Sequence, residues 1–134
     1  MGKLIGIISL VLVSNTLFGA KILIPMNAGN QNNHIKAYGI AYWVLQNDIE
    51  VEWLLNYRGG SFMMDHYNTI EEELIIRGVS YEKIANVQAQ AIKDEISDPE
   101  VNQEVVALHK APKIAVYSPD GKQPWDDAVT LVLA

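Results

Sequence analysis

Cysteine is absent from this 134-residue sequence, and the common catalytic signatures are absent as well. A chain without cysteine has no disulfides, no cysteine-ligated metal and no thiolate nucleophile. There is also no Gly-x-Ser-x-Gly nucleophile elbow, no P-loop and no complete dinucleotide fingerprint. His34, His66 and His109 are too far apart in sequence to form a His-x-x-x-His zinc pair. We therefore predict no cofactor and no metal, and the sequence alone does not establish whether the protein is an enzyme.

Basic residues are also few. Ten Lys and Arg face 16 Asp and Glu, which gives a formal net charge of −6 and a pI of about 4.9. Since no basic stripe is present, we predict no nucleic-acid partner. The sequence is 49% hydrophobic, which suffices for the core of one domain at this length.

No apolar run is long enough to span a membrane, since a spanning helix needs about 20 apolar residues. The N-terminus carries Lys3, then "LIGIISLVLV", then "SNTLFGA", which ends in small residues. This pattern is typical of a secretory signal peptide. We predict a signal peptide over residues 1–20 and a secreted or periplasmic domain over residues 21–134, with no stable membrane span after cleavage. The alternative is an uncleaved N-terminal anchor.

Strand and helix patterns alternate along the predicted domain, with apolar runs for strands and apolar spacings of three and four for helices. One face of the first helix carries five apolar residues: Ala37, Ile40, Ala41, Val44 and Leu45. We expect a strand over 21–25, a continuous apolar run, before that helix. After it we expect strand 51–57, helix 69–78, strand 79–84, two short helices within 86–108, strand 114–117 and a helix from Pro124. Such alternation predicts an α/β fold with a parallel sheet and helices on both faces.

The last expected helix has an apolar face that continues to the end of the sequence. Its apolar residues are Trp125, Ala128, Val129, Val132 and Leu133. Because a crossover helix normally returns the chain to another parallel strand, we expect the domain to be incomplete at the C-terminus. The alternative is a complete small domain whose terminal helix docks on it.

Three polar loops follow expected strands, and in a parallel sheet these loops share one edge, where ligands bind. Together they supply the candidate ligand-binding residues Asn27, Asn30, His34, Arg58, Gly59, Gly60, Ser61, Asp120 and Lys122. Arg58 and Lys122 would receive the carboxylate or phosphate of a small anionic ligand. The alternative is that these loops are turns without a ligand, because Gly, Pro and Asn are turn residues in their own right.

Two long stretches carry a resemblance to a known group: "HIKAYGIAYWVLQNDIEVEWLLNYRGGSF" and "APKIAVYSPDGKQPWDDAVTLVLA". They resemble the amino-terminal part of secreted bacterial proteins that are automatically labelled asparagine synthetase B. The resemblance implies glutamine-dependent asparagine synthesis, a layout similar to the flavodoxin-like class I glutamine amidotransferases, and family members that continue beyond this length. Glutamine-dependent asparagine synthetases use a cysteine nucleophile and a Ser-Gly-Gly-x-Asp-Ser loop for ATP, and the chain contains neither.

Three functions therefore remain open. The first is a secreted domain that binds a small polar or anionic ligand at the sheet edge. The second is the amide-handling enzyme that the resemblance implies. The third is an interaction module that uses Tyr38, Tyr42 and Trp43 as an exposed aromatic surface.

Overall fold

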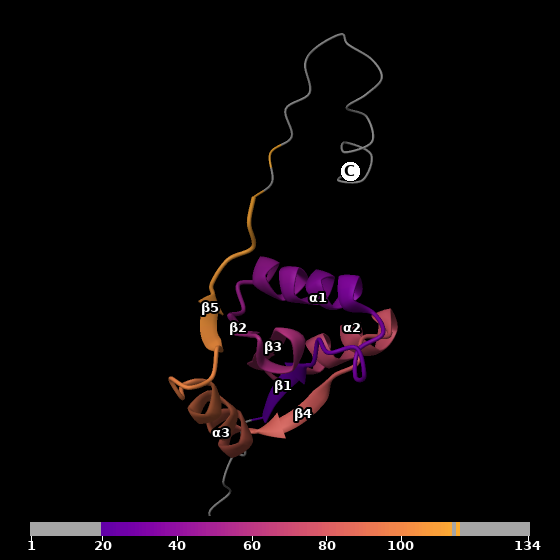
Figure 1. The fold of residues 1–134 in the computed structure, drawn as a ribbon. Helices are drawn as coiled ribbons and strands as arrows, with labels where there is room; N and C mark the ends of the chain where they lie inside the picture. Colours follow the sequence, from indigo (N-terminus) through magenta and orange to yellow (C-terminus); the bar gives the residue numbers. More distant parts are fainter. Residues whose placement is uncertain (1–19, 114, 116–134) are drawn as a thin grey trace, which may run out of the picture.

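The computed structural model describes residues 20–113 and residue 115 (Figure 1). Its elements are, in chain order, β1 (Ala20–Ile24), α1 (His34–Gln46), β2 (Val51–Leu55), the 3-10 turn η1 (Tyr57–Gly59), β3 (Ser61–Asp65), α2 (Asn68–Arg77), β4 (Glu82–Ala85), α3 (Asn86–Ile96) and β5 (Glu104–Leu108). The predicted strand 114–117, the predicted helix from Pro124 and nearly all of the predicted signal peptide lie outside the described residues.

The five strands form one sheet in the order β4-β1-β3-β2-β5, and every neighbouring pair is antiparallel. From β1 to β4 the elements follow the β-α-β-β-α-β order of the ferredoxin-like motif. Helix α3 then leads to β5, which extends the sheet by pairing with β2.

The predicted parallel sheet of the flavodoxin-like or amidotransferase-like type is therefore wrong. Its error lies at residues 57–65, because the chain reverses through η1 and forms the hairpin strand β3, which pairs with β2. Strand β3 also pairs antiparallel with β1 and so separates β1 from β2. Two strands that a helical crossover joins thus have an antiparallel strand between them.

Helices cover both faces of this sheet, as Figure 1 shows with α1 and α2 on one side and α3 on the other. Ile22 and Ile24 of β1 pack in the same core cluster as α1 and α2. Leu23 packs in the cluster that contains Ala89 and Ile96 of α3. All three β1 side chains are at most 1% exposed. The continuous apolar run of β1 thus comes from burial on two faces, which does not require a parallel sheet.

The α1 face was predicted correctly, since all five of its apolar residues are buried. The second short helix predicted before residue 108 is wrong. Residues Glu104–Leu108 instead form β5, with Val106 opposite Trp53 and Leu108 opposite Val51. The two valines in sequence favour an extended strand, and the open edge of β2 supplies the backbone partner.

Candidate functional site

Two of the three predicted ligand loops lie together at one end of the sheet. Strand β1 ends where β3 begins, with Ile24 opposite Phe62, so the β1–α1 loop lies beside the β2–β3 turn. The Met26 backbone N–H donates to the Arg58 carbonyl oxygen at 3.1 Å. The third loop, with Asp120 and Lys122, lies outside the described residues.

The Arg58 guanidinium at this end already has protein partners. Its Nη1 and Nη2 donate to the two carboxylate oxygens of Glu82 at 2.9 and 2.6 Å. Turned so that its oxygen faces the guanidinium, the Asn30 amide also accepts a hydrogen bond from Nη2 at 2.8 Å and another from Asn27. The hydrogen bond from Arg58 lowers the pKa of Glu82, and the same pair raises the pKa of Arg58. An anionic ligand would have to displace Glu82 from Arg58.

The remaining predicted residues at this end hold the loops in place. His34 Nε2 donates to the Met26 carbonyl at 2.9 Å, in the tautomer that carries the proton on that nitrogen. The buried Ser61 hydroxyl donates to the Tyr57 carbonyl at 3.0 Å. Gly59 and Gly60 both have positive φ, at 84° and 88°. These hydrogen bonds and backbone conformations give His34, Gly59, Gly60 and Ser61 structural roles in the two loops.

Gln31 fixes the same loop and was not recognised from the sequence. It is 1% exposed, and its Nε2 donates to the carbonyls of Pro25 and Ser80 at 3.3 and 3.1 Å. Its Oε1 accepts from the backbone N–H groups of Asn33 and Ser80. The amide thereby satisfies its hydrogen-bonding groups inside the protein and links the β1–α1 loop to the segment before β4. No local pattern distinguishes this glutamine from a surface residue.

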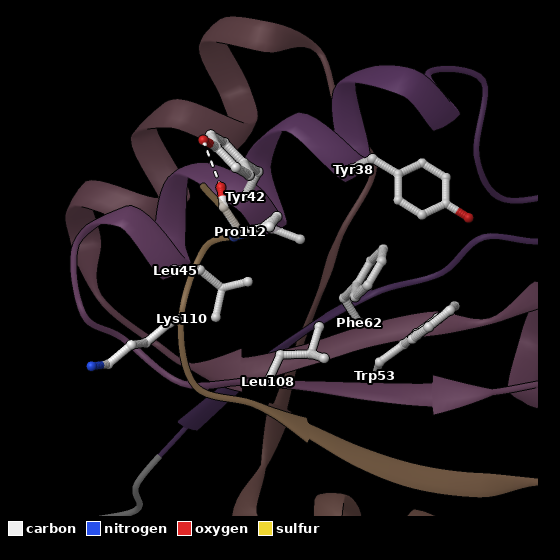
Figure 2. A pocket seen from close by; sticks show the side chains of 9 residues that line it. Tyr38, Tyr42, Leu45, Trp53, Phe62, Leu108, Lys110 and Pro112 are labelled. Atoms are coloured by element: carbon white, nitrogen blue, oxygen red, sulfur yellow. Dashed lines mark hydrogen bonds between the residues drawn. The ribbon is translucent and has the colours of Figure 1, made fainter. Parts of the chain in front are cut away.

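An apolar groove lies between α1 and the strands β2, β3 and β5 (Figure 2). Its volume is about 300 Å³, and it is open to solvent. The residues that line it are Tyr38, Ala41, Tyr42, Leu45, Trp53, Phe62, Leu108, Lys110 and Pro112. Figure 2 shows α1 above the groove and the side chains of β2, β3 and β5 below it.

Three aromatic rings form one wall of this groove. Tyr38 meets Phe62 edge-on, with ring centroids 5.4 Å apart and planes at 78°. Phe62 stacks with Trp53 at 6.2 Å. The Trp53 indole N–H already donates to the Gly60 carbonyl at 3.2 Å, so this ring offers only carbon to the groove. Tyr38 is 51% exposed although it packs on a buried phenylalanine.

The predicted aromatic surface is thus present in part. Tyr38 and Tyr42 line the groove and stay exposed, whereas Trp43 is half-buried and packs against the core. Ile35 lies one turn before Tyr38 on α1 and is 88% exposed. Together with Tyr38 and Tyr42 it forms a second apolar stripe on this helix, and all three side chains remain exposed.

A separate polar cluster surrounds Glu71 near the start of α2. Its carboxylate receives hydrogen bonds from His66 Nε2 at 2.6 Å and Lys83 Nζ at 2.8 Å on one oxygen. The Tyr81 hydroxyl donates to the other oxygen at 2.9 Å. These hydrogen bonds, the one from His66 above all, lower the pKa of Glu71 to about 2. The cluster joins the β3–α2 connection to β4 and has a structural role.

Replacing Glu71 with glutamine is expected to lower the free energy of unfolding at neutral pH and to have almost no effect near pH 2. The carboxylate titrates near 4.5 when it lacks these partners and near 2 in the folded protein. Its stabilising contribution is therefore complete above about pH 4.5 and is lost as the pH falls towards 2. Urea denaturation of both proteins across this range measures the difference. A difference independent of pH would contradict the assignment, and Glu72→Gln, at an exposed position on the same helix, is the control.

Within the described residues, no group of histidine or acidic side chains could hold a metal ion. No helix there is long and apolar enough to cross a bilayer. No family model, no curated protein and no solved structure matches this chain.

Proposed function

We propose that this domain is a docking module that binds the apolar face of a helical polypeptide segment in the groove between α1 and strands β2 and β5. The observation that supports this function is the open aromatic wall of Tyr38, Phe62 and Trp53 beside an exposed stripe on α1. Large apolar surfaces that stay exposed on a small domain mark interaction sites.

The chemistry of the lining favours a polypeptide over a small polar ligand. Small-molecule sites combine an apolar cavity with a few convergent polar groups. Here the polar side-chain groups of the lining are two tyrosine hydroxyls, the Trp53 N–H, which already donates to Gly60, and the Lys110 ammonium. Figure 2 shows that ammonium pointing away from the groove. An amphipathic helix needs only apolar contacts along such a trough, with anchors three and four residues apart.

The test is the binding of a synthetic amphipathic peptide of about 14 residues, with leucine at positions i, i+3, i+4 and i+7. We expect saturable binding to the full chain, measured by the fluorescence anisotropy of the labelled peptide. Tyr38→Lys places a charge against the aromatic wall and should weaken binding by about tenfold or more. Because Tyr38 is half-exposed, this variant is expected to keep the fold.

The matched control is Val87→Lys, which adds the same charge at a 76% exposed position on α3, away from the groove. Peptide binding should be unchanged in this variant. Equal binding losses in the two variants would contradict the proposal.

The other two functions remain predictions. Binding of a small ligand near Asn27, Asn30 and Arg58 has in its favour that these residues lie together, and against it that Glu82 occupies the guanidinium. The amide-handling activity rests on the sequence resemblance alone. Incubation of the chain with glutamine, aspartate and ATP, followed by an assay for ammonia, tests the activity.

A further inference from the structure

We infer that the segment seated in this groove is residues 124–133 of the same chain. This inference rests on the proposed function, because it names the partner of the same groove. Four observations carry it: the path of the chain after β5, the apolar spacing of the segment, its charges and its tether length.

The chain leaves the described part of the structure at the rim of the groove. Leu108, Lys110 and Pro112 all line the groove as the chain passes from β5 along α1. The Tyr42 hydroxyl donates to the Pro112 carbonyl at 3.5 Å, a contact drawn in Figure 2. The segment that follows Lys113 is therefore covalently tethered at the rim of the groove.

The sequence of the segment fits an amphipathic helix. Pro124 suits the first helical position. The apolar residues after it have helical spacing: Trp125, Ala128, Val129, Val132 and Leu133. This stripe matches the anchors that a trough beside a helix accepts. Without a partner it would leave a large apolar surface in water.

The charges of the two sides are complementary. Asp126 and Asp127 stand at the start of the segment, while Lys110 and Lys113 are exposed beside the rim of the groove. Acidic side chains in the first turn also favour helix formation. A helix seated with its start near the rim brings opposite charges together.

The tether makes the chain's own segment a stronger competitor than a separate partner. Trp125 follows Pro112 by about a dozen residues, which span up to about 40 Å when extended. A linker of this length keeps a segment at an effective concentration of roughly millimolar. The segment then occupies the groove most of the time even if it binds weakly, whereas a second copy competes only at its bulk concentration.

Disulfide trapping tests the inference in the full chain, and the absence of native cysteine makes the introduced thiols the only ones. Tyr38→Cys is combined with Val129→Cys or with Val132→Cys. We expect at least one pair to close an intramolecular disulfide about tenfold faster than the control pair Val87→Cys/Val129→Cys, as a tethered segment seated near Tyr38 requires. Migration on a non-reducing gel reports the closure.

The possible outcomes separate this inference from the proposed function. Closure at equal rates in the test and control pairs overturns the inference, and a disulfide-linked dimer instead assigns the groove to a second copy. In the chain without introduced cysteines, Val129→Asp should tighten binding of the amphipathic peptide, because it removes the internal competitor. Peptide binding that Val129→Asp leaves unchanged overturns the inference and keeps the function, whereas no peptide binding in either protein overturns the function.

Discussion

Replacing Gly59 with alanine is expected to destabilise the domain by about 3 kcal/mol or more, since two costs combine at this position. The backbone φ is +84°, where a side chain is strained, and an added Cβ would lie 2.7 Å from the Met26 carbonyl carbon. The neighbouring atom is backbone and has little room to move, because Met26 N–H is bonded to the Arg58 carbonyl. Thermal or urea denaturation measures the loss.

Alanine substitutions at two other glycines separate the cost of the backbone strain from the cost of the steric clash. Gly60→Ala has the same kind of φ, +88°, but its Cβ meets only the Trp53 indole nitrogen at 3.4 Å, so the loss should be about 1–2 kcal/mol. Gly39→Ala lies in α1 with no atom within 4 Å of the added Cβ and should stabilise by roughly 0.5–1 kcal/mol. A Gly59→Ala protein as stable as Gly60→Ala would show that the two loops are not in contact.

Replacing Phe62 with alanine is expected to cost about 3–5 kcal/mol. Phe62 is 3% exposed on β3, the central strand, where it packs between Tyr38 and Trp53. Its removal leaves a cavity that the paired strands on each side cannot close. The variant is also expected to lose peptide binding, because Phe62 belongs to the aromatic wall.

Tyr38→Ala is the matched control for this prediction. It removes a ring from the same aromatic contact, but from the half-exposed side, so the loss should be only about 1 kcal/mol. Equal costs for the two variants, measured by urea denaturation, would mean that β3 is not the central strand of a packed sheet.

The helices of this domain were predictable from sequence, because each has a regular signal. The apolar spacing of α1 gave the residues that pack on the sheet. Helix α2 ends at Gly78, whose φ of 66° is the left-handed conformation expected after a helix. Such signals are local and hold whatever sheet the helices pack on.

The sheet topology was not predictable in this way. Strand β3 is buried on both faces from Ser61 to Met64 and so lacks the alternation of a half-exposed strand. The turn before it contains Arg58, which has positive φ without being a glycine. The sequence around Arg58 therefore resembled a ligand loop more than a hairpin. Because the chain turns back here, β3 lies antiparallel between β1 and β2, and this placement changes the topology of the sheet.

In the candidate site, too, local features were predictable from sequence and non-local ones were not. Residues of the exposed α1 stripe were identified as a possible interaction surface because their spacing is local. The strand residues that line the groove were not identified, since Trp53, Phe62 and Leu108 come from three strands that only the antiparallel pairing brings together.

The most direct test of the docking function is an isotope-filtered NOE experiment on the labelled full chain, here carrying Val129→Asp, saturated with the unlabelled amphipathic peptide. The account predicts cross-peaks from the peptide to the methyl groups of Leu45 and Leu108, and none to those of Val87 on α3. Cross-peaks to Val87 in place of the two leucines would contradict it.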